Sequence, residues 1–243
     1  MIEEWFYRET LYKNMMRLLK KVCIVGIALL LFPLAMGNVS GEKIVLVTGF
    51  EPFGSYAVNP SEMIAEALNG SILDDAKIIG IVLPVDFDRS VENAIAAIEH
   101  YQPDVVISLG LAARSKVISV EKIGMNLKRF PKDDGTWSFP RRIEKDGPFL
   151  RVTPLSTYEI ARTLRKDNIP AQQSFCAGLY ICNALFYGLL GYAKDQSVNT
   201  TIGFIHVPLL ETQDPQGMPL EIMIDAVKMA IQVSLGSRGV YGN

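Results

Sequence analysis

The sequence predicts an α/β fold: a three-layer sandwich with a mostly parallel, twisted sheet, in a single domain preceded by an N-terminal apolar segment. Short runs rich in β-branched residues alternate along the chain with amphipathic stretches of helical period. Strands that alternate with helices in this way build a mostly parallel sheet with helices packed on it. The composition, 49% hydrophobic and 21% charged, is that of an ordinary globular protein.

The predicted elements follow from these two patterns. The apolar runs predict strands at Lys43–Gly49, Ala76–Leu83, Asp104–Gly110, Val117–Lys122 and Thr200–Val207. Apolar residues three or four positions apart predict helices at Ser61–Leu68, Arg89–His100, Ser156–Lys166, Leu179–Leu190 and Leu220–Leu235.

Three local signals complete this outline. Ser156 followed by Glu159 has the spacing of a capping box, which predicts a helix start there. His100 is expected to cap the end of its helix, where a positive charge is favoured. Residues 128–148 are polar and contain Asp-Gly twice, which predicts a loop or a hairpin.

The N-terminus has a different character. Val22–Gly37 carries no charge and follows the basic pair Lys20 and Lys21. As a helix it would span roughly 24 Å, short of the hydrocarbon core of a membrane, and a basic flank before a short apolar run is typical of a signal peptide. We therefore expect residues 1–41 to be a signal or anchor segment with its linker, which exports the protein or tethers it to a membrane. Residues 42–243 are expected to form the domain.

Charge and composition narrow the function classes. The chain has 24 Lys and Arg against 26 Asp and Glu, a net charge of −2, so no basic excess exists to bind nucleic acid. Its 2 His and 3 Cys would nearly all be needed for one zinc site. We expect no nucleic-acid partner and no metal.

Three residues could carry chemistry. Cys182 lies near the start of an apolar helix, where the helix dipole favours a thiolate. His206 ends a predicted strand, and Glu121 lies within a β-branched one. Each has a plain structural alternative: a small buried thiol, a structural histidine and an exposed edge carboxylate. Together they could form a nucleophile, a base and an orienting acid, although their spacing alone does not select this interpretation.

Four motifs in order resemble the pyroglutamyl peptidases, also called pyrrolidone-carboxylate peptidases. Residues 43–70 contain Val-Thr-Gly-Phe-x-Pro-Phe-Gly and then Asn-Pro-Ser, as in the N-terminal signature of that family. Residues 119–126 resemble its catalytic-glutamate strand, residues 177–188 its cysteine helix and residues 203–208 its histidine motif. The resemblance extends over nearly all of the chain after the apolar segment.

The resemblance implies a cysteine exopeptidase that removes an N-terminal pyroglutamyl (5-oxoproline) residue from peptides, without a cofactor. Cys182 would be the nucleophile, His206 the general base and then acid, and Glu121 the group that orients the imidazole. The resemblance also implies a homo-oligomer. Because this family resembles cytosolic enzymes, a cytoplasmic location is the alternative to export.

The resemblance further implies a pocket for the pyroglutamyl ring. Phe50 and Phe53 match the aromatic pair that binds the ring, and the other matching positions are Val85, Phe130, Tyr180 and Ile181. Core packing is the alternative for all six.

Three departures from the family pattern lie at residues 111–114, residues 124–131 and Cys176. The altered loop at 124–131 leaves open a catalytically inactive pyroglutamyl-binding protein on the same fold. We expect Cys176 to be a buried, unreactive thiol that forms no disulfide with Cys182.

Overall fold

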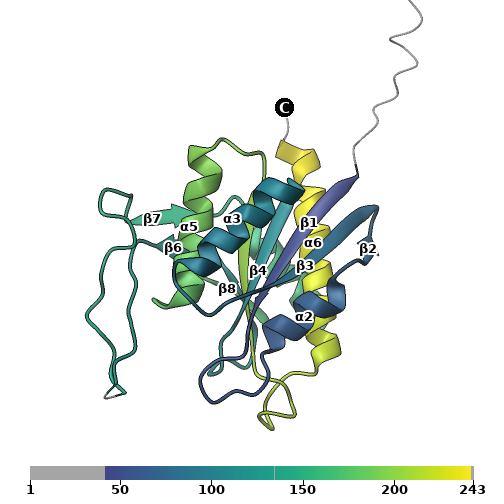
Figure 1. Ribbon diagram of the computed structural model, residues 1–243. Helices are drawn as coiled ribbons and strands as arrows, with labels where there is room; N and C mark the ends of the chain where they lie inside the picture. Colours follow the sequence, from purple (N-terminus) through teal and green to yellow (C-terminus); the bar gives the residue numbers. More distant parts are fainter. Residues whose placement is uncertain (1–41, 134, 242–243) are drawn as a thin grey trace, which may run out of the picture. The chain divides into compact units, whose positions relative to one another are not determined.

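The computed structural model describes residues 42–133 and 135–241, with side chains described as far as residue 236 (Figure 1). The predicted signal or anchor segment Val22–Gly37 therefore lies outside the described residues. Within the described ranges, no helix combines the length and apolar character needed to cross a membrane.

A seven-stranded sheet forms the centre of the domain. Its strand order is β2-β3-β1-β4-β9-β5-β8. The bounds are β1 Lys43–Phe50, β2 Ile72–Leu73, β3 Ala76–Leu83, β4 Val105–Leu111, β5 Ile118–Glu121, β8 Ala171–Ser174 and β9 Thr201–Val207. β1 runs parallel to β3 and β4, β4 to β9, and β5 to β8, whereas β2 and β3, and β5 and β9, are antiparallel. The predicted α/β fold with a mostly parallel sheet is confirmed.

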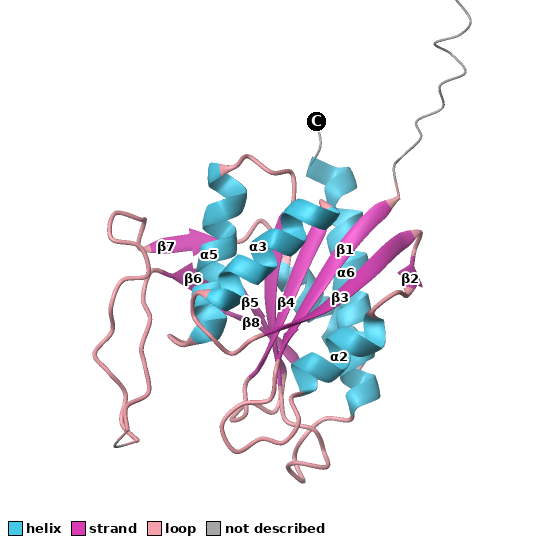
Figure 2. Ribbon diagram, viewed as in Figure 1, coloured by secondary structure: helices cyan, strands magenta, loops and turns pink. Residues whose placement is uncertain are grey.

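Helices pack on both faces of this sheet (Figure 2). Their bounds are α2 Pro60–Leu68, α3 Arg89–Tyr101, α4 Thr157–Lys166, α5 Ile181–Asp195 and α6 Leu220–Tyr241. One buried cluster joins the sheet to α2, α4 and α6, and a second joins it to α3 and α5. Along β1, Val45 and Val47 belong to the first cluster and Leu46 and Phe50 to the second, because successive side chains of a strand point to opposite faces.

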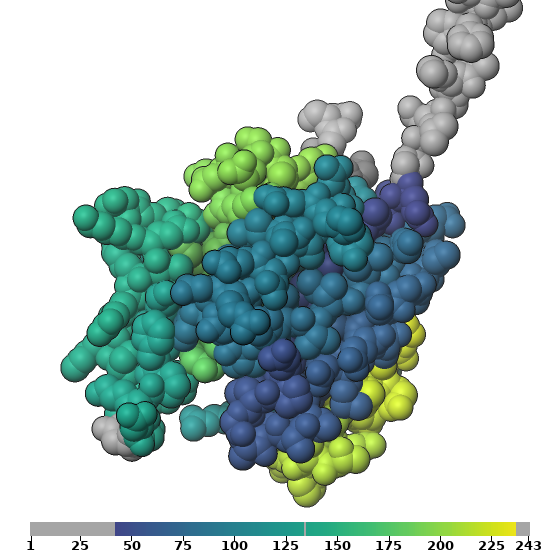
Figure 3. All heavy atoms as spheres, viewed as in Figure 1, coloured from purple at the N-terminus to yellow at the C-terminus, as the bar shows by residue number. Residues whose placement is uncertain are grey.

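The structure differs from the predicted elements at several short strands. A two-stranded sheet of β6 (Ile123–Met125) and β7 (Leu150–Val152) stands apart from the main sheet. These strands, with β2 and β8, are two to four residues long and show no periodicity that sequence patterns could reveal. The loop or hairpin predicted at residues 128–148 is a loop with paired segments, coloured teal at the left of Figure 3, in which Lys128 and Arg141 exchange both backbone hydrogen bonds.

The capping box predicted for α4 is wrong. The Ser156 side chain makes no capping hydrogen bond, and Glu159 forms a 2.6 Å ion pair with Arg162 on the same helix. Glu159 is thus engaged one turn along the helix and does not reach back to its start. His100 lies in the last turn of α3, as expected, but Gln102, in the left-handed conformation, is the residue that ends the helix.

Candidate active site

His206 and Glu121 lie on the neighbouring antiparallel strands β9 and β5. In this pairing Ser119 is opposite His206 and Glu121 is opposite Phe204. Residues opposite one another point to the same face of a sheet, so these side chains share the face that α5 covers. His206 Nδ1 lies 2.8 Å from Glu121 Oε1, and the two residues are only 8% and 1% exposed. The sheet register therefore builds a buried imidazole–carboxylate pair.

The carboxylate of Glu121 is directed at a single partner. Its second oxygen, Oε2, is buried and has no hydrogen-bond partner among the described residues. A buried carboxylate is costly unless an opposite charge compensates it. The geometry thus favours a protonated His206 as that compensating group.

Cys182 enters this site from the first turn of α5. Gly178 takes φ 77°, a left-handed conformation that glycine adopts without strain, two residues before Tyr180 at the N-cap of the helix. Cys182 then occupies the second helical position, and its sulfur lies against Gly110, the register partner of His206 on β4. Because Nδ1 of His206 is bonded to Glu121, the other ring nitrogen, Nε2, is the one available to the thiol.

Because Gly110 has no side chain, the Cys182 sulfur can occupy the space beside it. Gly110 is the register partner of His206 on β4. A Cβ at this position would lie 2.8 Å from Cys182 Sγ and 2.9 Å from Cζ of Phe204. Only a residue without a side chain lets the sulfur approach the ends of β4 and β9 this closely.

Asn183, the residue after Cys182, attaches the start of α5 to the segment that follows Glu121. Its amide nitrogen donates to the carbonyl oxygens of Met125 and Leu127, both at 2.8 Å, and its amide oxygen accepts from the Met125 N–H at 2.9 Å. Asn183 is fully buried. Sequence reasoning placed Asn183 in the cysteine motif but missed this positioning role.

The environment of His206 changes its protonation. Burial alone would lower the pKa of His206, but the hydrogen bonds to Cys182 and Glu121 and the negative charges of both outweigh it and raise the pKa to about 10. The imidazolium form is therefore favoured at neutral pH. An imidazolium between a sulfur and a carboxylate is the arrangement that a thiolate nucleophile requires.

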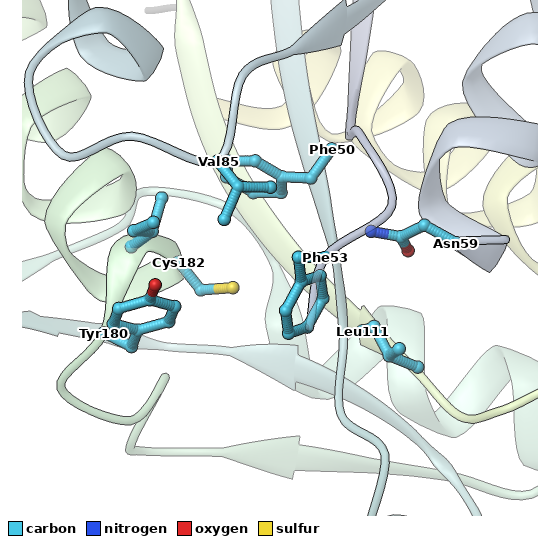
Figure 4. A pocket seen from close by; sticks show the side chains of 8 residues that line it. Phe50, Phe53, Asn59, Val85, Leu111, Tyr180 and Cys182 are labelled. Carbon is cyan, nitrogen blue, oxygen red and sulfur yellow. The ribbon is translucent and has the colours of Figure 1, made fainter. Parts of the chain in front are cut away.

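A small apolar pocket opens beside the thiol (Figure 4). Its volume is about 270 Å³, including space open to solvent. The structure places five of the six predicted pocket residues and the thiol on its wall, together with two that sequence reasoning missed. The lining residues are Phe50, Phe53, Asn59, Val85, Leu111, Tyr180, Ile181 and Cys182.

Phe130 is the predicted pocket residue that does not line this pocket. Its ring packs against Phe87, with ring centroids 4.7 Å apart, and Phe87 in turn contacts Tyr180 at 5.3 Å. Phe130 thus lies one residue behind the pocket wall. Phe87, which connects it to the wall, belongs to no motif and could not be identified from the sequence.

Asn59 is a lining residue that sequence reasoning missed, and its side chain makes hydrogen bonds with residues nearby in the chain. Its oxygen accepts from the backbone N–H and the hydroxyl of Ser61 at the start of α2, and its nitrogen donates to the Glu51 carbonyl at 3.1 Å. These bonds connect α2 to the loop after β1, which carries Phe53. Leu111 was missed because it ends β4, in a stretch identified only as a departure from the family pattern.

Cys176 does not lie where the sequence suggested. Its side chain is exposed, so the expectation of a buried thiol is wrong. Cys176 lies two residues after the end of β8 at Ser174, and Phe175 between them is 59% exposed. Within the described residues, Cys176 and Cys182 are both free thiols, as expected.

No group of three or more His, Cys, Asp or Glu side chains able to hold a metal occurs in the part of the chain that the structure describes.

Comparison with known proteins gives a consistent result. The sequence profile of the family described as "Pyroglutamyl peptidase" matches residues 43–237. The pyrrolidone-carboxylate peptidase of Vibrio campbellii is 37% identical over 196 residues, 78% of this chain and 92% of that relative. Two solved structures are similar with a TM-score of 0.75. The pyrrolidone carboxyl peptidase from Thermococcus litoralis is 35% identical and is matched over 83% of this chain and 97% of its own. The pyroglutamyl peptidase I of Bacillus amyloliquefaciens is 33% identical, with 80% and 98% matched.

Proposed function

The chain belongs to the pyroglutamyl peptidase family, and we propose that Cys182, His206 and Glu121 are its catalytic triad. The activity is that of a pyrrolidone-carboxylate peptidase, a cysteine peptidase that removes N-terminal pyroglutamate from peptides. The observation that carries the assignment is the buried 2.8 Å pair of His206 and Glu121, which lies beside a thiol on the wall of the apolar pocket.

The reaction then proceeds through a thioester. The Cys182 thiolate attacks the pyroglutamyl carbonyl carbon, and the carbonyl π electrons move to oxygen. When the tetrahedral intermediate collapses, the C–N bond breaks and His206 gives its proton to the leaving amine. His206 next accepts a proton from water, which attacks the thioester and releases pyroglutamate together with the thiolate. Glu121 keeps the imidazole oriented and stabilises its charged form.

The first turn of α5 supplies hydrogen-bond donors for the developing oxyanion. The first N–H groups of a helix have no partner within it, and the Tyr180 side chain at the N-cap makes no capping bond. The backbone N–H of Cys182 and those beside it are therefore available at the helix end, where negative charge is favoured.

The test is release of 4-nitroaniline from pyroglutamyl 4-nitroanilide by the full chain under reducing conditions. Alanyl 4-nitroanilide, which has a free ammonium in place of the lactam, is the matched control substrate. We expect turnover of the first substrate alone, and loss of that turnover after treatment with a thiol-blocking reagent. A folded, reduced protein that bound pyroglutamate without turnover would be the inactive binding protein instead.

Replacing Gly110 by alanine is expected to lower kcat/KM for the pyroglutamyl substrate by about 100-fold. The new methyl group would occupy the space of Cys182 Sγ, so the thiol must turn away from His206. The matched control is Gly236→Ala, where a Cβ would meet no atom within 4 Å. Circular dichroism would establish that both variants fold. Wild-type kcat/KM in Gly110→Ala would contradict the placement of the sulfur.

Two further proposals concern parts of the protein outside this site. We propose that Val22–Gly37 exports the protein or tethers it to a membrane, and that residues 42–243 are the enzymatic domain. Recovery of the full chain in the soluble cytoplasmic fraction would contradict export and tethering. We also propose a homo-oligomer, on the basis of the family resemblance, and a monomer by size-exclusion chromatography with light scattering would contradict it.

A further inference from the structure

Four residues form a row across the sheet at the level of His206. Gly110 on β4, which lies beside the Cys182 sulfur, is the register partner of His206 on β9. On the other side of His206, Ser119 on β5 lies opposite it. Gln172 on β8 is in turn the register partner of Ser119. From β4 to β8 the row therefore holds the site of the sulfur, the imidazole, a hydroxyl and an amide.

The Ser119 side chain points to the same face of the sheet as His206. Ile118 and Val120, its neighbours along β5, belong to the buried cluster on the opposite face, with α2, α4 and α6. Opposite residues of an antiparallel pair have Cβ atoms about 4.5–5.5 Å apart. Ser119 and His206 also have similar small exposures, 6% and 8%. The Ser119 hydroxyl is thus an immediate neighbour of the imidazole, on the side away from Gly110.

The hydrogen of the Ser119 hydroxyl is available to a ligand. Gln172 Nε2 donates a 3.1 Å hydrogen bond to Ser119 Oγ, so the oxygen is used as an acceptor. Within the described ranges, the structure gives the Ser119 O–H no acceptor of its own. A hydroxyl that accepts one hydrogen bond still donates another, and the bond that it accepts strengthens it as a donor.

The strand order places Ser119 on the leaving-group side of the thiol. Among the pocket residues, Phe50 and Leu111 end β1 and β4, whereas Ser119 lies on β5, beyond β9. In the proposed mechanism His206 gives its proton to the leaving nitrogen. A peptide whose ring occupies the pocket therefore passes His206 and continues over β5. Its next backbone carbonyl follows the leaving nitrogen after a single Cα atom, which brings that carbonyl to the neighbour of His206.

We infer that the Ser119 hydroxyl donates a hydrogen bond to the backbone carbonyl of the residue after pyroglutamate, and that Gln172 holds Ser119 Oγ for this bond. This inference rests on the proposed function of the same site. Every peptide substrate has this carbonyl, whatever its side chains, and a simple amide or arylamide of pyroglutamate lacks it. Ser119 and Gln172 thus favour peptides as the substrate class, separately from recognition of the ring.

The experiment uses two substrates with the same pyroglutamyl ring. Pyroglutamyl-alaninamide has a carbonyl beyond the leaving nitrogen, whereas pyroglutamyl 4-nitroanilide has an aromatic ring there. kcat/KM is measured for both, by chromatography of released pyroglutamate and by absorbance of 4-nitroaniline. Because kcat/KM reports the steps up to acylation, the later attack of water on the thioester does not enter the comparison. The quantity compared is the ratio of the first kcat/KM to the second.

Three variants are compared with wild type. Ser119→Ala removes the hydroxyl, and Gln172→Ala removes, from an exposed position, the group that holds it. Ser156→Ala is the matched control, because it makes the same substitution at the start of α4, where the Ser156 side chain makes no capping hydrogen bond. Circular dichroism establishes that each variant folds.

We expect the ratio to fall by about 10-fold in Ser119→Ala and by about 3-fold in Gln172→Ala, and to keep its wild-type value in Ser156→Ala. A wild-type ratio in either of the first two variants would overturn the inference. This includes an equal loss of kcat/KM on both substrates, which would show that the hydroxyl acts only through His206. Failure of the wild type to cleave either substrate would instead contradict the proposed function.

Discussion

Replacing Cys182 by serine is expected to reduce turnover of pyroglutamyl 4-nitroanilide by about 10⁴-fold or more. A serine hydroxyl is a far weaker nucleophile than a thiol beside an imidazole, so the attack on the pyroglutamyl carbonyl becomes very slow. The rest of the pocket wall is kept, because Phe50, Phe53 and Val85 come from other segments of the chain. Binding of pyroglutamate, measured by calorimetry, should therefore stay within a few-fold of wild type.

The other described cysteine provides the control. Cys176 is exposed, whereas Cys182 is only partly accessible. Cys176→Ser should retain wild-type kcat and KM, since Cys176 is exposed and is not one of the residues that line the pocket. Turnover that survived in Cys182→Ser, or that was lost in Cys176→Ser, would contradict the assignment of the nucleophile.

Removing the imidazole is expected to cost nearly as much as removing the thiol. In His206→Ala the Glu121 carboxylate loses its hydrogen-bonded partner, and the leaving amine loses its proton donor. We expect kcat to fall by about 10³-fold or more. In the double variant with Cys182→Ser, kcat should fall no further than in the more damaged single variant, because the effects of replacing residues that act as one unit are not additive. Wild-type kcat in His206→Ala would show that another group is the base.

Glu121→Gln is the matched milder change, because it keeps a hydrogen-bond partner for the imidazole while it removes the charge. Two of the interactions that raise the pKa of His206 come from Glu121. Without the carboxylate charge that pKa should fall, so the alkaline limb of the kcat/KM profile should move to lower pH. An alkaline limb at the same pH in both proteins would contradict a charge-stabilising role of Glu121.

The proposed triad and most of the residues that line the pocket could be selected from the sequence because four motifs carry them in a fixed order. The relative placement of His206 and Glu121 could not. The strand patterns predicted a mostly parallel sheet, but the orientation of β5 depends on long-range pairing, and it is the antiparallel register with β9 that brings the two side chains to one face.

The errors have local physical causes. Phe130 was predicted on the pocket wall, but its ring packs against Phe87, which in turn contacts the wall residue Tyr180, and such packing of aromatic rings leaves no trace in sequence spacing. Cys176 was expected to fill a buried space, but the chain between β8 and α5 carries this side chain on the surface. The Asn183 bonds to Met125 and Leu127 likewise connect residues more than fifty positions apart.

The most direct test of the central claim, that Cys182 is a thiolate nucleophile served by this pocket, is affinity labelling with a pyroglutamyl chloromethyl ketone. In this reaction the thiolate displaces chloride from the methylene carbon, and peptide mapping by mass spectrometry locates the added mass. We predict one label per chain, on Cys182, with activity lost in proportion, while the more exposed Cys176 is labelled only by the unselective reagent iodoacetamide. Labelling of Cys176 at a comparable rate, or full activity with Cys182 labelled, would contradict the account.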